Sequence, residues 1–190
     1  MYPINLSSFV RVVFMLILLP AVALAEGQTA TSLSPLGYTL GSAQRADVEN
    51  SLRRKADVRP KGTNRYSSGP MLLAEGAELG VEGLLSALFI FDSHETLVAV
   101  QLTLNKGFGE EFDRTYARLA AKYPLVKKTV PFVGNKYARF EKGTDIIELN
   151  APHLNFAMTV TYMTRGFEQN YIKVSRQDAR EKEKHEGSQF

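Results

Sequence analysis

The sequence contains no cysteine. This absence excludes disulfide bonds, thiolate metal sites, a cysteine nucleophile and a cysteine that could accept a lipid. The sequence also lacks a glycine-rich phosphate loop, the His-Glu-x-x-His pattern of zinc hydrolases and the Gly-x-Ser-x-Gly pattern of serine hydrolases. The fold must therefore be stabilised by packing alone, and we expect neither a metal nor a cofactor.

The sequence also has little excess of charge of either sign. The 23 Lys and Arg residues nearly balance the 20 Asp and Glu residues, and the formal net charge is +3 at pH 7. Because proteins that bind nucleic acids usually carry a marked basic excess, we expect no nucleic-acid partner.

An apolar run near the N-terminus predicts a cleavable secretory signal over residues 1–25. Arg11 precedes the run Val12–Leu19, and Ala23-Leu24-Ala25 follows it as a cleavage site. The run is short for a membrane span of about 20 residues, which argues against an uncleaved anchor. No second run of spanning length follows, so we expect no transmembrane segment after cleavage. Export without disulfides favours the bacterial periplasm, with the chain soluble or peripheral there.

The mature chain divides into three predicted parts. Residues 26–35 are small and polar, which indicates a flexible leader. Residues 36–165 are expected to form one α+β domain, and residues 166–190 a C-terminal helix that continues into a charged tail. A mature length of about 165 residues suits a single domain with a real hydrophobic core.

Two apolar runs, 84–92 and 96–104, are rich in β-branched and aromatic residues and predict paired central strands. Alternation places the even-numbered residues from Val98 to Leu104 on one apolar face of the second run. The same rule gives the last strand an apolar face made of the even-numbered residues from Phe156 to Tyr162. The outer face of that strand then carries Thr159 and Thr161.

Helical periodicity completes the expected fold. Apolar residues at 112, 116, 119 and 123 predict an amphipathic helix that Pro124 ends. Val48 and Leu52 indicate an earlier helix, which Ser42 would cap after a short strand that begins near Leu36. Short strands separated by turns follow Pro124. This order predicts an α+β fold in which helices cover one face of an antiparallel sheet, and it allows two tandem helix-plus-meander repeats.

The opening LGYTLGSAQRADVENSL, with Gly41 before the helix and Val48 and Leu52 four residues apart on it, resembles the start of a known structural unit. The unit is the helix-then-meander repeat of β-lactamase-inhibitor-like envelope proteins, which include small outer-membrane-assembly lipoproteins. Two such units would cover most of residues 36–163. The chain departs from the lipoproteins in having no cysteine to lipidate. The resemblance implies a protein-binding or assembly role in the envelope without catalysis.

The tetrapeptide Asp92-Ser93-His94-Glu95 separates the two central strands. Asp and Ser are favoured in hairpin turns because their side chains bond nearby backbone N–H groups. A Ser-His-acid triad normally draws its members from separate segments, so we interpret these neighbours as a turn. The alternative is a small periplasmic hydrolase that uses His94 and His153 with a carboxylate such as Asp92. It requires both histidines to share one cleft.

A binding surface is expected on the open face of the sheet. Alternation turns Tyr137 and Arg139 to one side of their strand, and exposed Tyr and Arg are typical of interface hot spots. Tyr66 could line a groove on this face together with Tyr137. Thr159 and Thr161 would add polar groups from the outer face of the last strand. We expect a protein or envelope component to bind there. A small-ligand carrier is a further alternative, and it predicts an apolar cavity between sheet and helices.

Overall fold

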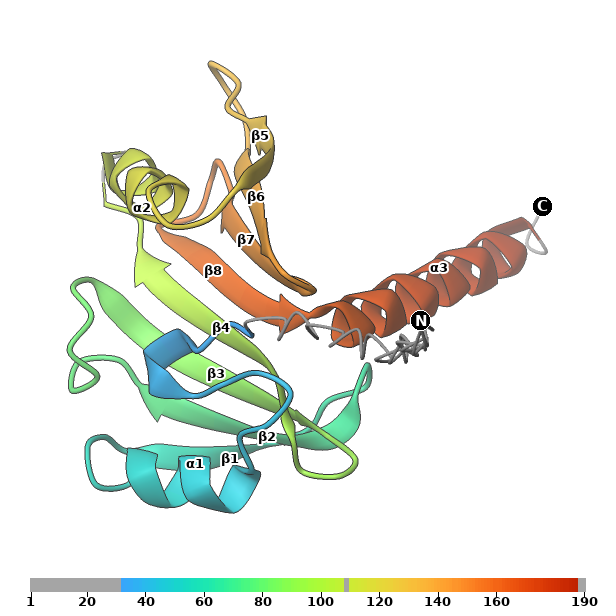
Figure 1. Cartoon of the computed structure of the whole chain (residues 1–190). Helices are drawn as coiled ribbons and strands as arrows, with labels where there is room; N and C mark the ends of the chain where they lie inside the picture. Colours follow the sequence, from blue (N-terminus) through green and yellow to red (C-terminus); the bar gives the residue numbers. More distant parts are fainter. Residues whose placement is uncertain (1–31, 108–109, 188–190) are drawn as a thin grey trace, which may run out of the picture.

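A computed structural model of the protein describes residues 32–107 and 110–187, so the predicted signal sequence and most of the predicted leader lie outside the described residues. Within them, eight strands form one antiparallel sheet in the order β1-β2-β3-β4-β8-β7-β6-β5 (Figure 1). The predicted α+β fold is thereby confirmed. The elements are a 3-10 turn (Pro35–Gly37), α1 (Arg45–Leu52), β1 (Val58–Thr63), β2 (Ser68–Glu75), β3 (Leu84–Asp92), β4 (Leu97–Asn105), α2 (Glu110–Ala120), β5 (Leu125–Thr129), β6 (Lys136–Lys142), β7 (Asp145–Ala151), β8 (Ala157–Thr164) and α3 (Arg165–Gly187).

The described chain passes twice through the same order of elements. Helix α1 is followed by the four strands β1 to β4, and α2 by the four strands β5 to β8. The last strands of the two halves, β4 and β8, pair at the centre of the sheet, from Ala99 opposite Met163 to Asn105 opposite Ala157. Within the sheet this pairing is what joins the halves. Their interpretation as tandem repeats of one unit stays a prediction.

The two faces of the sheet are covered differently. Helices α1 and α2 lie on the helical face, where their side chains Val48 and Phe112 pack in one core with Phe89 and Phe140 of the strands. On the opposite face, here called the open face, Phe167 at the start of α3 packs against a small apolar cluster. Helix α3 then runs away from the sheet (Figure 1). The expected covering of one face by helices is confirmed.

The segment before α1 differs from the prediction. Leu33, expected in the flexible leader, is 1% exposed and packs in the core of the helical face. The chain does not form the strand expected from Leu36, because Pro35 starts a 3-10 turn and Gly37 takes a φ of 87°, which glycine tolerates without strain. A hydrogen bond from Leu40 N to Leu33 O (2.9 Å) closes this loop. The packed domain therefore includes Leu33.

Three predictions about single side chains are wrong for local reasons. Ser42 does not cap α1, because the helix starts later, with Gln44 at its N-cap and no side-chain capping bond. Val98 leaves the helical face because an irregularity shifts the register of β3 and β4 there, and it packs with the cluster on the open face. Phe156 precedes β8 and is 83% exposed.

Asp145, at the start of β7, is a buried carboxylate. It is 3% exposed and accepts a hydrogen bond from the backbone N–H of Leu33 (2.8 Å). Burial raises the pKa of Asp145, and this hydrogen bond opposes the shift only in part. Because the folded-state pKa lies above the unfolded one, the contribution of Asp145 to stability is complete below about pH 4 and is lost as the pH rises through the folded pKa.

We expect Asp145→Ala to lower the free energy of unfolding by about 1–3 kcal/mol, because it leaves the N–H of Leu33 buried without an acceptor. Asp145→Asn keeps an acceptor oxygen and removes the charge, so it should equal or exceed the wild type at about pH 7. Urea unfolding at about pH 4 and about pH 7 measures both effects. The control is Asp57→Asn, at an exposed aspartate. An Asn variant that is less stable than the wild type at neutral pH would contradict this account.

Candidate functional site

The open face carries a row of polar side chains across its central strands. In register, Thr161 of β8 lies between Gln101 of β4 and Glu148 of β7. Two residues away on β8, Thr159 lies between Thr103 and Asn150. The Gln101 amide donates a hydrogen bond to the hydroxyl of Thr161 (3.4 Å). The row thus presents hydrogen-bonding groups and one carboxylate where a sheet with both faces covered would present apolar side chains.

An ionic network ties the edge of this row to α3. The guanidinium of Arg139 on β6 contacts the carboxylates of Glu141 (2.9 Å) and Glu148 (3.3 Å), and it also bonds Glu168 in the first turns of α3. Arg165 contacts Glu141 from the other side (3.2 Å). The side chains of Arg139 and Glu168 are only 16% and 12% exposed. The network therefore fixes the start of α3 against β6 and β7.

Contacts within this network shift the pKa values of Arg139, Glu141 and Tyr137. The hydrogen bond to Glu168 raises the pKa of Arg139 further above its ordinary value, although burial opposes the shift. Hydrogen bonds from Arg139 and then Arg165 lower the pKa of Glu141. Burial, followed by a hydrogen bond from the Tyr137 hydroxyl to Glu148 (2.6 Å), raises the pKa of Tyr137 well above its ordinary value. At neutral pH Tyr137 is thus a neutral donor beside charged partners.

A cleft of about 350 Å³ lies beside this network, between the sheet and the start of α3. Tyr66 forms one wall, with its ring centre 6.4 Å from that of Phe167 and 4.8 Å from that of Tyr171. The side chain of Asn64 accepts a hydrogen bond from the backbone N–H of Tyr66 (2.9 Å), which holds the turn that presents the ring. The lining residues are Asn64, Tyr66, Leu88, Ile90, Gln101, Glu148, Asn150, Thr159, Thr161, Met163, Phe167 and Tyr171. The cleft therefore has an aromatic and aliphatic end and a polar end.

The structure brings the five predicted surface residues into one region in two roles. Tyr66, Thr159 and Thr161 line the cleft itself. Tyr137 and Arg139 lie behind the lining and both contact Glu148 through its Oε1 atom. Arg139 is therefore a positioning residue whose side chain is largely buried, and it is less accessible than the sequence suggested.

Sequence reasoning missed the other nine lining residues of the cleft, and the placement of the four discussed next depends on contacts between separate segments. Gln101 and Glu148 meet through the pairing of β8 with both β4 and β7. Phe167 and Tyr171 reach the cleft because α3 starts directly after β8. Their spacing of four residues was the available signal, since it puts both rings on one side of a helix.

The two candidate catalytic histidines do not share a site. His94 lies in the turn before β4, and His153 lies in the turn before β8. Since β8 starts opposite Asn105, at the end of β4, the two turns lie at opposite ends of the sheet, separated by nine residues of extended strand or about 30 Å. The common cleft that the hydrolase alternative requires is therefore not formed by these histidines.

The tetrapeptide around His94 is a hairpin turn, as the sequence predicted. One carboxylate oxygen of Asp92 accepts hydrogen bonds from the backbone N–H groups of His94 (2.9 Å) and Thr96 (2.9 Å). Glu95, which takes a φ of 61°, forms an ion pair with Arg45 of α1 (2.8 Å). Asp92 thus stabilises the turn, and Glu95 links the turn to α1.

The helical face contains a second cavity, of about 290 Å³, between α2 and the central strands. Leu102, Leu104, Met158 and Val160 contribute apolar lining, and Tyr162 also reaches it. Burial raises the pKa of Tyr162 to about 12. A cavity of this size lies at the lower limit of ligand pockets, which commonly span about 300–1,000 Å³. The carrier alternative therefore has a cavity to support it, but a small one.

Comparisons with protein-family models, with curated proteins and with solved structures find no match. The resemblance to β-lactamase-inhibitor-like envelope proteins stays a prediction, and the site is interpreted from its own geometry. In the part of the chain that the structure describes, no helix is both long and apolar enough to cross a membrane. The same residues contain no group of three or more His, Cys, Asp or Glu side chains placed to hold a metal ion.

Proposed function

We propose that the protein is an exported, non-catalytic binding module of the periplasm that takes an extended segment of a partner protein on its open face. The observation that carries the proposal is the cleft beside α3, which joins an aromatic end to a row of hydrogen-bonding groups. A peptide needs both, because its side chains require apolar contacts and its backbone requires hydrogen-bond partners.

The charges around the cleft favour a basic segment. The ionic network contains three carboxylates, Glu141, Glu148 and Glu168, against two guanidinium groups, Arg139 and Arg165. One negative charge is therefore in excess, and Glu148 is the network member that lines the cleft. A Lys or Arg side chain of the partner would be attracted to Glu148, while an apolar side chain would occupy the end near Tyr66.

Two features of the sequence support export and an envelope role. The predicted signal over residues 1–25 would direct the chain across a membrane. The resemblance of residues 36–52 to helix-then-meander envelope proteins implies protein binding and assembly. Both are compatible with a binding surface on an open sheet face.

The proposal is tested by selecting peptides from a random library on the mature chain, residues 26–190. We expect enriched peptides to combine a basic residue with an aromatic or aliphatic one. Thr161→Arg places a bulky cation in the middle of the polar row, so it should weaken binding of these peptides at least about tenfold, as measured by isothermal titration calorimetry.

The matched control is Asn50→Arg, at an exposed position of α1 on the helical face. This variant adds the same charge away from the cleft and should bind the peptides as the wild type does. Equal binding by the Thr161→Arg variant, or no enrichment on the wild type, would overturn the proposal.

A further inference from the structure

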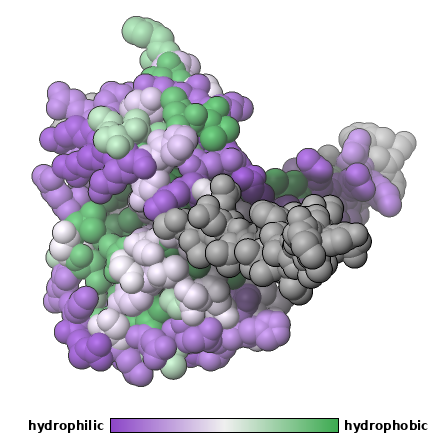
Figure 2. Space-filling model, viewed as in Figure 1, coloured by the Kyte–Doolittle hydropathy of each residue, from purple (hydrophilic) through white to green (hydrophobic). Residues whose placement is uncertain are grey.

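Two apolar loops project from the same end of the sheet. One is the turn between β5 and β6, residues 130–135, and the other is the turn between β7 and β8, residues 152–156. They are neighbours because Lys136, which follows the first loop, pairs with Ala151, which precedes the second. The tip of the first loop is the projection above β5 in Figure 1, and Figure 2 shows hydrophobic colour there.

These loops expose several large apolar side chains that do not pack in the core. Phe132 is fully exposed, Leu154 is 93% exposed, Phe156 is 83% exposed and Val133 is 66% exposed. A soluble surface carries single exposed apolar side chains routinely, but a group of large ones at one end indicates a contact site. The sequence prediction had placed Phe156 in the core, so its exposure is a finding of the structure.

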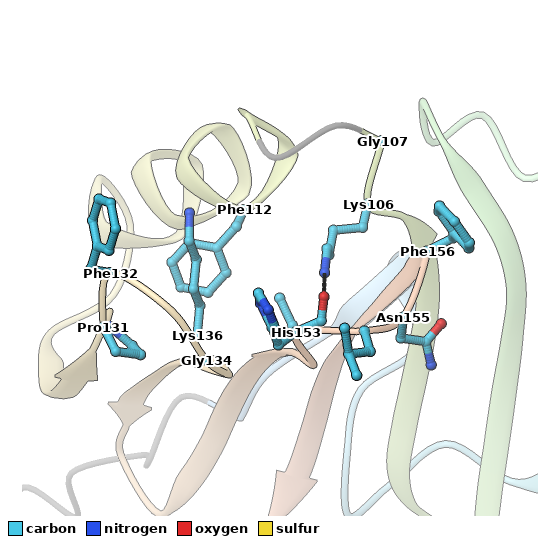
Figure 3. A pocket seen from close by; sticks show the side chains of 12 residues that line it. Lys106, Gly107, Phe112, Pro131, Phe132, Gly134, Lys136, His153, Asn155 and Phe156 are labelled. Carbon is cyan, nitrogen blue, oxygen red and sulfur yellow. Dashed lines mark hydrogen bonds between the residues drawn. The ribbon is translucent and has the colours of Figure 1, made fainter.

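Hydrogen bonds hold the loops in their projecting shape. The side chain of Asn135 in the first loop accepts a hydrogen bond from the backbone N–H of His153 in the second (2.8 Å). The ammonium of Lys106, just after β4, donates to the carbonyl oxygens of Pro152 (2.6 Å) and His153 (3.1 Å), and Figure 3 shows the bond to His153. The backbone N–H of Lys106 also donates to the carbonyl oxygen of Phe156 (2.7 Å). The apolar tips are thus presented on a braced support.

The shape of this end of the sheet favours a deformable binding partner over a rigid protein surface. A hollow of about 420 Å³ separates the loops, with Phe132 on one side and Phe156 on the other. In Figure 3 both rings are directed away from the strands, and His153 lies between them. Separate tips that point outward can all enter a fluid layer at once, whereas a rigid protein partner would need a matching hole for each.

Basic side chains lie directly behind the apolar tips. Lys127 and Lys128 lie on β5 just before the first loop, and Lys136 follows it; Lys106 supports the second loop. The acidic residues nearby are in the first turn of α2: Glu110, Glu111 and Asp113. Of these, Glu111 pairs with Arg114, and Asp113 lies 3.6 Å from Lys136. The balance of this end is therefore basic, as suits contact with anionic headgroups.

We propose that this end of the sheet docks on a lipid bilayer that contains anionic lipid. Phe132, Val133, Leu154 and Phe156 enter the interface between headgroups and acyl chains, and the positive charge of the lysines behind them attracts the anionic headgroups. Helix α3 starts at the opposite end of β8, so docking leaves the open face accessible. The protein would then be peripheral, held by its loops.

The chain contains no tryptophan, which gives a direct test. In the mature chain, residues 26–190, Phe132→Trp introduces a single tryptophan at the tip of the first loop, which can be excited selectively over the tyrosines. On vesicles of phosphatidylcholine and phosphatidylglycerol its emission should shift to shorter wavelength, because the indole leaves water. The matched control, Ile172→Trp on the solvent side of α3, should show no shift.

Affinity is measured by co-sedimentation with the same vesicles. The variant Phe132→Ser combined with Phe156→Ser should bind at least about tenfold more weakly than the wild type, and Ile172→Ser should bind like it. Pure phosphatidylcholine vesicles should bind the wild type less. Three outcomes would overturn the proposal: no sedimentation of the wild type, equal binding by the double variant, or self-association of the wild type that the double variant abolishes.

Discussion

An Arg139→Ala variant is expected to lose about 2–3 kcal/mol of its free energy of unfolding. The guanidinium contacts Glu141, Glu148 and Glu168, and its removal leaves three carboxylates close together, two of which still contact Arg165. Breaking a buried ion pair costs about 3–5 kcal/mol, and the partial exposure of Glu141 and Glu148 reduces that figure here. Chemical unfolding in urea at neutral pH measures the loss.

Acid should reduce the difference between this variant and the wild type. The pKa of Glu141 is lowered in the folded protein, so the stability that this group contributes is present above about pH 4.3 and is lost as the pH falls through the folded pKa. Hydrogen bonding by Arg139 is the largest cause of that lowering, so the variant has less of this stability to lose.

The control for Arg139 is Arg114→Ala, which removes an exposed pair with Glu111 on α2. Such surface pairs contribute about 0–1 kcal/mol. Equal losses in the two variants would mean that the network at α3 contributes no more than an ordinary surface pair, and that Arg139 does not hold α3 in place.

Replacing Phe167 with Ala is expected to release α3 from the sheet at a cost of about 3 kcal/mol. The ring is 8% exposed and packs with Ile90, Ile146 and Met163 on the open face. Removing a buried Phe side chain costs about 3–5 kcal/mol, and the small size of this cluster favours the lower value. Hydrogen exchange of the α3 amides should accelerate more than exchange in the central strands.

Ile172→Ala is the matched control, since Ile172 is on the same helix and is 37% exposed. It should leave both the exchange rates and the unfolding midpoint close to those of the wild type. If Phe167→Ala accelerates exchange uniformly across the sheet instead, α3 is an integral part of the cooperative core. Because Phe167 is also a wall of the cleft, the Phe167→Ala variant should lose peptide binding together with the order of α3.

The sequence predicted the elements whose signals are local. Apolar residues at 112, 116 and 119 predicted α2. Alternation along β8 predicted that Thr161 and Val160 lie on opposite faces of the sheet. Asp92 marked a hairpin turn because its side chain bonds the adjacent backbone. Each of these depends on residues fewer than about ten positions apart, where periodicity and turn chemistry decide the outcome.

The remaining features depend on contacts between distant segments. Leu33 was assigned to a leader because its neighbours are polar, yet a backbone bond to Asp145, 112 positions away, accompanies its burial in the core. The cleft arises from the joining of Tyr66, the centre of the sheet and the start of α3. Alternation showed which residues of β6 and β8 turn outward, and the turn at Asp92 predicted the pairing of β3 with β4, but neither signal showed that β4 lies beside β8.

The central pairing of β4 with β8 has a consequence for how the chain assembles. Gln101 and Thr161 are 60 positions apart, whereas the hairpin neighbours within each half are close in sequence. Local hairpins form early and distant pairings late, because closing a long loop costs chain entropy before contacts repay it. Until β8 arrives, β4 is an unpaired edge rich in valine and leucine, which is the kind of strand that recruits other chains. A chain that crosses a membrane from its N-terminus would expose the edge of β4 before β8 had emerged. The chain would therefore be prone to associate with other chains until its last strand, β8, has paired.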